Sequence, residues 1–156
     1  MSKDVLLRPA RSDEYDLLGE LMFDAIHNGP TQYTKAQSKA WAPTPKRGAE
    51  WAARLNKQHV ILAERASEVL GFMSIEPGGY IDFAYIRPRA QGRGLFRELF
   101  DAIVGHAIAQ GDTVLSTHAS LMAQPAFAAM GFTIDYHEEV AVNGQLLPRA
   151  RMIKPL

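Results

Sequence analysis

The residues whose types and spacing best suit a binding site lie between Ile86 and Gly94, in the segment IRPRAQGRG. Gly92 and Gly94 permit backbone conformations that are closed to other residues, and they let a ligand approach the main chain closely. Helical periodicity begins directly after them. The first amides of a helix lack internal partners and carry partial positive charge. This segment therefore predicts a binding site for an anionic group.

Arginines gather around these glycines, at positions 87, 89, 93 and 97. Arg93 and Arg97 are one helical turn apart and share a face of the expected helix. The whole chain has 17 basic and 17 acidic residues, so a local excess of positive charge predicts a phosphate-bearing ligand. The alternative is a tight turn between strand and helix with solvated arginines, which would bind nothing.

Two common phosphate-binding motifs are absent from the sequence. A Walker A loop needs G-x-x-x-x-G-K-[ST], which does not occur. A dinucleotide fingerprint, G-x-G-x-x-G, would need a third glycine where Arg97 stands. These comparisons argue against a P-loop nucleotidase and against a dinucleotide-binding fold.

Composition excludes several other classes of site. The chain of 156 residues has no cysteine, which excludes disulfides, cysteine–zinc sites, iron–sulfur clusters and thiol nucleophiles. Its zero net charge argues against a general nucleic-acid binder. The five histidines lack ligand spacing, so we expect no metal. No apolar run is long enough to span a membrane, and we expect a soluble cytoplasmic protein.

Hydrophobic periodicity predicts a single mixed α/β domain over residues 1–156. Helices are expected after the caps Ser12 and Thr34, over Ala49–Leu55, over Gly94–Gln110, and between Ser120 and Met130. Strands are expected at Val5–Arg8, His59–Glu64, Val69–Glu76, Tyr80–Ile86, Val114–Thr117, Phe132–Val142 and Leu146–Ile153.

The connections predict how the strands pair. The turns between the strands of residues 59–86 are too short for a crossover, so these strands should form an antiparallel meander. The long helix lets Val114–Thr117 lie parallel to Tyr80–Ile86. Asn143-Gly144 is a preferred hairpin dipeptide between the last two strands.

Gln91 to Phe96, after a strand and Pro88, resembles motif A, Q/R-x-x-G-x-G/A, of the GNAT superfamily of N-acetyltransferases. The segment from Ala126 to Phe132 is similar to a second family segment, A-x-x-x-x-G-F. The resemblance implies a GNAT-like domain with a mixed, mostly antiparallel central sheet flanked by helices. It also implies acetyl-CoA as cosubstrate. The implied cofactor-binding residues are Phe83, Ala84, Tyr85, Ile86, Gln91, Gly92, Arg93, Gly94, Leu95, Phe96 and Phe127.

The sequence departs from the family pattern at two positions. Phe96 stands where motif A ends in Gly or Ala; a register shifted by two residues, starting at Arg89, also fits the pattern, although the spacing to Ile86 and Pro88 favours Gln91. Phe127 stands where many members have a tyrosine that protonates the leaving thiolate. Phe127 has no proton to give, so that role is unassigned.

The resemblance implies that a primary amine attacks the acetyl thioester directly in a ternary complex, since no cysteine can carry the acetyl group. The strand Phe83–Ile86 would offer backbone amides to the carbonyl. Asp82 and Ser120 are the candidate catalytic residues, with His118 a further candidate acid. Strand alternation predicts Asp82 on the face opposite Phe83 and Tyr85. Structural roles compete: an ion pair for Asp82, a helix cap for Ser120.

A second hypothesis is a non-catalytic acyl-CoA-binding module on the same fold, which Phe127 favours. The partner of the enzyme would be a small-molecule amine or a protein amine, and we expect neither nucleic acid nor membrane as a partner. Exposure of the last two strands would suit a homodimer. The sequence leaves open the acceptor, the general base and the acyl chain preference.

Overall fold

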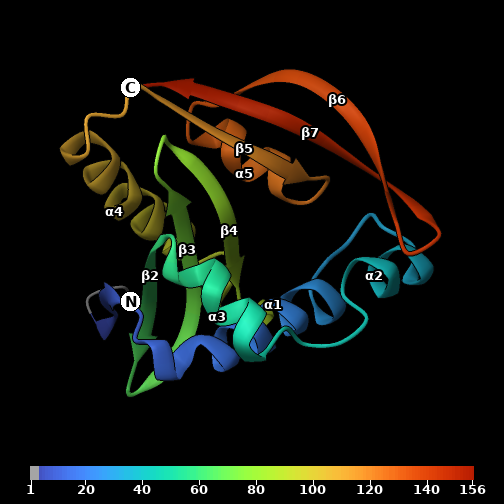
Figure 1. Ribbon diagram of the computed structural model, residues 1–156, viewed down its shortest axis with the longest axis horizontal. Helices are drawn as coiled ribbons and strands as arrows, with labels where there is room; N and C mark the ends of the chain where they lie inside the picture. The colour runs from blue at the N-terminus through green and yellow to red at the C-terminus, as the bar shows by residue number, and fades with distance from the viewer. Residues whose placement is uncertain (1–3) are drawn as a thin grey trace.

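A twisted sheet of seven strands forms the centre of the computed structural model, which describes residues 4–156 (Figure 1). The strand order is β1-β2-β3-β4-β5-β7-β6. All neighbours pair antiparallel except β4 and β5, which are parallel. The strands are β1 (Leu6–Pro9), β2 (His59–Arg65), β3 (Glu68–Glu76), β4 (Tyr80–Ile86), β5 (Val114–Ser120), β6 (Thr133–Val142) and β7 (Gln145–Pro155).

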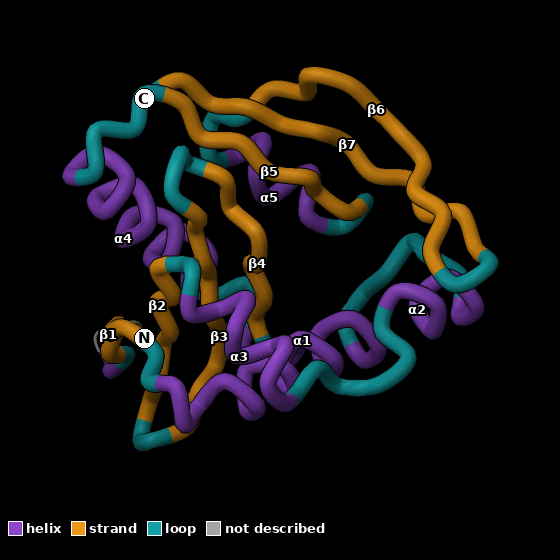
Figure 2. Tube along the Cα trace, in the orientation of Figure 1, coloured by secondary structure: helices purple, strands orange, loops and turns teal. Residues whose placement is uncertain are grey.

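Helices cover both faces of this sheet (Figure 2). The chain passes from α1 (Tyr15–Asn28) through α2 (Lys35–Trp41) to α3 (Gly48–Asn56) before the meander, and α4 (Leu95–Ala109) and α5 (Ala123–Ala129) follow it. Short 3-10 turns at Ser12–Glu14 and Pro88–Ala90 precede α1 and α4. These elements confirm the expected mixed sheet flanked by helices.

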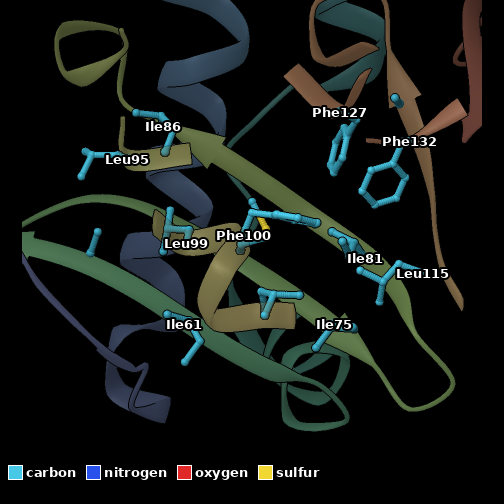
Figure 3. Packing of buried hydrophobic residues seen from close by; sticks show 14 of the residues in the cluster. Ile61, Ile75, Ile81, Ile86, Leu95, Leu99, Phe100, Leu115, Phe127 and Phe132 are labelled. Atoms are coloured by element: carbon cyan, nitrogen blue, oxygen red, sulfur yellow. The ribbon is translucent and has the colours of Figure 1, made fainter. Parts of the chain in front are cut away.

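Two apolar clusters, one on each face, hold the helices to the sheet. On one face, α4 and α5 bury Leu99, Ile103 and Phe127 against β2, β3, β4 and β5 (Figure 3). On the other, α1 and α3 bury Leu18 and Trp51 against β2, β3 and β4. Burial of such side chains contributes about 1.5–3 kcal/mol each, so the position of each helix start is fixed by its own apolar stripe.

Thr34 and the Asn143-Gly144 turn take their predicted roles, but the prediction that Ser12 caps the first helix is wrong, because Ser12 lies inside the 3-10 turn and Glu14 is the N-cap residue of α1. The Thr34 hydroxyl accepts a hydrogen bond from Gln37 N, and the Gln37 side chain accepts one from Thr34 N, a capping box. Asn143 and Gly144 both have positive φ, 47° and 82°, as a two-residue hairpin of type I′ requires. The pairing of β5 with β4 is parallel, as predicted.

The long β6–β7 hairpin arches away from the rest of the sheet to reach α2 (Figure 1). Gln37 donates a hydrogen bond to Leu146 O, and Asn143 donates one to Ala40 O. The Tyr33 hydroxyl donates to Pro148 O at 2.5 Å. Trp41 of α2 packs against the same apolar cluster as α1 and α3, so the hairpin reaches the α2 end of that face.

A β-bulge at Asp82 overturns the expected alternation along β4. Ile81 pairs with Ile75 and Phe83 pairs with Ser74, so Asp82 is an extra residue in its strand. Asp82 bonds to Arg54 on α3, and the ring of Phe83 lies under the same guanidinium. The prediction that Asp82 faces away from Phe83 is wrong, because the bulge resets the alternation between them.

Across residues 4–156, none of the helices combines the length and apolarity needed to cross a bilayer. Within the same residues, no three His, Cys, Asp or Glu side chains gather closely enough to hold a metal ion.

Candidate functional site

The backbone at the start of α4 has open space beside it. Gly92 and Gly94 have φ values of +75° and +83°, in a region that residues other than glycine rarely adopt. A Cβ added to either glycine would meet no described atom within 4 Å. The first amides of α4 have no partner within the helix. Open space beside these amides is the arrangement that an anion needs.

The four arginines divide into two pairs with different roles. Arg87 binds Asp24 at 3.0 Å and Val69 O at 3.2 Å. Asn28, and then Arg87, keep the pKa of Asp24 below its usual value. Arg89 pairs with Glu68. These two arginines attach the loop to β3 and α1 and are committed to structure.

Arg93 and Arg97 form no ion pair with any residue of the described chain, 4–156. Arg93 also lines a small cavity of about 140 Å³, together with Val5, Arg65, Leu70, Arg89, Ala90 and Leu95. Two uncommitted guanidiniums beside free helix amides fit a ligand with more than one negative charge.

Gln91 and Leu95 fix the loop to the sheet. Gln91 Nε2 donates to Ile86 O at 3.2 Å, which ties the loop to the end of β4. Leu95 is buried in the α4 cluster. The first turn of α4 is therefore held in place from both sides of the glycines.

Beside this loop, β4 and β5 diverge. The two strands pair only at Tyr80–Ser116 and Ile81–Thr117, and Thr117 Oγ1 donates to Ile81 O at that point. Beyond it, β4 continues to Ile86 without a strand neighbour on this side. The segment Phe83–Ile86, which was predicted to offer backbone amides, therefore lies beside a gap between β4 and β5.

The amides along the splayed strand are not equivalent. Phe83 N donates to Ser74 Oγ, and Arg87 N donates to Leu70 O, so both point toward β3. Successive amides of a strand point in opposite directions. The N–H groups of Ala84 and Ile86 consequently face the gap, and Phe83 N is already used. Tyr85 is half-buried, and the loss of solvent around its phenol raises its pKa.

The two departures from the family pattern contact each other. The rings of Phe96 and Phe127 meet edge to face with centroids 5.2 Å apart, and Phe127 contacts Phe132 in the same way. Phe127 is only 2% exposed. The large residue at the end of the motif therefore packs against α5, and this contact explains how the first turn of α4 accommodates it.

The two candidate catalytic residues both have structural partners. Asp82 accepts hydrogen bonds from Arg54 Nε and Nη2 at 2.9 and 2.8 Å and from Gln58 Nε2 at 2.7 Å. The carboxylate raises the pKa of Arg54. Ser120 Oγ accepts from Ala123 N at 3.3 Å, at the start of α5. The ion pair and the helix-start bond are the structural alternatives that the sequence left open.

Three polar side chains from three strands, of which two are hydrogen-bonded, lie at the mouth of the gap. The Tyr80 hydroxyl lies 2.8 Å from His118 Nδ1, and His118 Nε2 lies 3.8 Å from Glu138 Oε2. Arg149 donates to the same Glu138 oxygen at 2.6 Å. Sequence reasoning considered His118 alone. Tyr80 and Glu138 had no local signal, because the strand pairing brings them together from 38 and 20 positions away along the chain.

Comparisons with known proteins agree with this geometry. A family model described as an acetyltransferase (GNAT) domain matches residues 30–153. Among solved structures, a GCN5-related N-acetyltransferase from Rhodopseudomonas palustris has 29% identity and a TM-score of 0.88, over 97% of this chain and 95% of that one. No curated protein matches the chain.

Two more distant structures share the fold. A ribosomal-protein-alanine N-acetyltransferase from Brucella melitensis has 22% identity and a TM-score of 0.75, over 97% of this chain and 99% of that one. A phosphinothricin acetyltransferase from Sinorhizobium meliloti, in complex with acetyl-CoA, has 22% identity and a TM-score of 0.73, over 98% and 89%.

Proposed function

Because the chain belongs to the GNAT family of acetyltransferases, we propose that it moves an acetyl group from acetyl-CoA to a primary amine by direct attack in a ternary complex. The observation that carries this proposal is the start of α4. Positive φ at Gly92 and Gly94, free helix amides and uncommitted Arg93 and Arg97 meet there beside a splayed β4.

The residues at this site suit acetyl-CoA, whose bound form supplies the activated acetyl thioester. The amides of residues 92–96 and the guanidiniums of Arg93 and Arg97 would hold the diphosphate. The gap beside β4 would take the pantetheine arm, where the N–H groups of Ala84 and Ile86 have no strand partner. The Phe96–Phe127 contact would give this arm an apolar border. The remaining contacts predicted from the family, at Phe83, Tyr85, Gln91 and Leu95, belong to the same proposal.

Asp82 and Ser120 remain predicted catalytic residues. The three donors around Asp82 favour a positioning role through Arg54, since a base must give up part of that ion pair to take a proton. Asp82→Asn keeps the shape of the side chain and separates the two roles. If Asp82 only positions Arg54, the variant should be slower but keep the shape of the pH profile. If Asp82 is the base, the pH profile of the variant should lack the acid limb. Unchanged rates at every pH would remove Asp82 from the reaction.

The transfer is tested by the release of free CoA thiol from acetyl-CoA with a panel of amines. The protein has no cysteine, so a thiol reagent reports CoA without background from the chain. The panel includes phosphinothricin and a peptide with an N-terminal alanine, because two proteins of the same fold are acetyltransferases named for such acceptors. We expect thiol release above the rate without amine for at least one primary amine.

A non-catalytic acyl-CoA-binding module is the second candidate. The observation that favours it is Phe127, a buried ring with no ionisable group at the position of the family's acid. Tight binding of acetyl-CoA, with no thiol released above the amine-free rate for any member of the panel, would support the module and overturn the transferase.

A homodimer through the last strands is a further part of the proposal. β6 is an edge strand of the sheet, and Ile134 and Tyr136 on it are each 45% exposed. Such exposed apolar edges favour pairing with another chain. Sedimentation equilibrium of the wild type and of Tyr136→Lys measures whether this edge supports assembly.

A further inference from the structure

A phenol, an imidazole and a carboxylate lie in a row at the point where β4 and β5 separate. Tyr80 comes from β4, His118 from β5 and Glu138 from β6. His118 directly follows Thr117, the last residue of β5 that pairs with β4. Leu115 and Ala119 are buried in the α4 cluster, so His118 points to the opposite face, which also carries α3. The row therefore lies at the opening of the gap in which the thioester is proposed to bind.

The polarity of the row follows from its chemistry. Burial, and then Asp82, raise the pKa of Tyr80, so the phenol keeps its proton and donates it toward His118 Nδ1 across 2.8 Å. A neutral imidazole that accepts at Nδ1 carries its proton at Nε2. Nε2 lies 3.8 Å from Glu138 Oε2. This tautomer leaves His118 ready to accept a second proton through Tyr80.

Burial, more than the surrounding charges, favours the neutral form of His118. Glu138 on β6 and Arg149 and Arg151 on β7 are the charged groups that act on it, and Tyr80 contacts it from β4. Burial, and then Arg149, lower the pKa of His118, while Glu138 opposes them. At neutral pH the imidazole is therefore an available base. The carboxylate of Asp82, in contrast, already accepts three hydrogen bonds.

We propose that Tyr80 and His118 are the proton-accepting pair of the acetyl transfer, with Glu138, whose Oε2 lies 3.8 Å from Nε2, as the carboxylate that stabilises the imidazolium once it forms. The proposal rests on the transferase function proposed above. It assigns the base role to His118, which the sequence offered only as a candidate acid, and to Tyr80, which had no signal in the sequence.

The proton balance of the step is complete. A bond forms between the amine nitrogen and the acetyl carbonyl carbon, and the C–S bond breaks with its electron pair on sulfur. Tyr80 Oη takes the proton that the amine nitrogen loses and passes its own proton to His118 Nδ1. The side chain of His118 is 22% exposed, so the imidazolium returns the proton to water. The thiolate takes a proton from water.

The first test uses nuclear magnetic resonance of the histidine side chains in the free protein and with CoA. We expect His118 to carry its proton at Nε2 and to titrate below 6.5. Tyr80→Phe should shift its ring nitrogen signals and its midpoint, while Tyr136→Phe, an exposed tyrosine on β6, should not. A proton at Nδ1 of His118 in the wild type would overturn the proposal without any assay of activity.

The second test follows kcat/KM against pH with the best amine of the panel. Tyr80→Phe and His118→Gln should each lower kcat by about 10²-fold and remove the acid limb of the profile. His106→Gln, a histidine that stacks on His59 at the far end of α4, is the matched control and should leave both unchanged. Calorimetry with CoA should give the wild-type affinity for all of these variants.

Two charge variants separate a base from a merely structural histidine. Arg149→Met should move the acid limb to higher pH, because Arg149 lowers the pKa of His118, and Glu138→Gln should move it to lower pH. Transfer with an unchanged limb in all four variants would overturn the relay and leave the transferase standing. CoA binding with no turnover of any amine would instead overturn the transferase, and the relay with it.

Discussion

One backbone angle at Gly94 determines whether the first amides of α4 can face a ligand. Its φ is +83°, and no described atom lies within 4 Å of a Cβ built there. A side chain at this position would not clash with the protein, so its costs are the strained backbone and the space it takes from a ligand. Left-handed backbone costs a non-glycine residue about 1–2 kcal/mol.

We predict that Gly94→Ala weakens acetyl-CoA binding at least about tenfold, because it adds a methyl group where the diphosphate is proposed to bind. Gly111→Ala is the matched control. Gly111 ends the same helix with φ +86° and equal open space, so it carries the same backbone strain outside the site. Thermal unfolding should show similar losses for both variants. Equal calorimetric affinities in the two variants would contradict the proposed site.

Phe127 offers a second test at the residue scale. The ring is buried against Phe96 and Phe132, where a hydroxyl would find no partner among the apolar neighbours. We predict that Phe127→Tyr costs about 1–3 kcal/mol of stability and does not raise kcat, as measured by denaturant unfolding and thiol release. A gain in kcat would show that the position still reaches the sulfur and that the family's acid role can be restored.

At the scale of elements, a charged network joins β1, the first 3-10 turn and β2. Arg8 binds Glu14 at 2.7 Å and Glu64 at 2.9 Å, and Glu14 also accepts from Arg11 N. The hydrogen bond from Arg8 lowers the pKa of Glu14 to about 2. This network fixes the start of α1, which packs with α3 on one face of the sheet.

The lowered pKa of Glu14 makes this contribution depend on pH. The folded state favours the ionised carboxylate of Glu14. Its contribution to the free energy of unfolding is therefore complete above the unfolded pKa of 4.5 and is lost as pH falls toward about 2. We predict that Glu14→Gln lowers the free energy of unfolding by about 1–3 kcal/mol at pH 7, and that this difference shrinks below pH 4.5.

Glu139→Gln on β6 is the control for the Glu14 variant. Glu139 is exposed and forms no ion pair within residues 4–156, so its replacement should change stability little at any pH. Urea unfolding at a series of pH values measures both variants. A Glu14→Gln effect that stays constant from pH 7 to 3 would show that the carboxylate charge is not the source.

At the scale of the whole molecule, the sequence predicted the elements well and their side-chain partners less well. Tyr80–Ile86 was predicted with its observed bounds, because Pro77-Gly78-Gly79 ends the preceding strand sharply. The anion loop was predictable because glycines, arginines and a helix start are adjacent in sequence. Local signals of this kind act within a few residues, which is why they could be read from the sequence.

The errors and omissions arise from contacts between distant segments. The bulge that turns Asp82 toward α3 depends on pairing between β3 and β4. The residues of the segment YIDFAYI do not predict it. Arg54 reaches Asp82 from 28 residues away. Tyr80 and Glu138 meet His118 only because β5 lies beside β4 and β7 in the sheet. These groups of side chains follow from the strand order of the sheet, which local sequence patterns do not predict.

The most direct test of the central claim compares CoA with pantetheine by titration calorimetry. Both ligands carry the thiol arm, but only CoA carries the diphosphate that the start of α4 is proposed to bind. We predict that CoA binds one molecule per chain and that pantetheine binds at least about 10²-fold more weakly. Equal affinity for the two ligands, or no heat with CoA, would contradict the account.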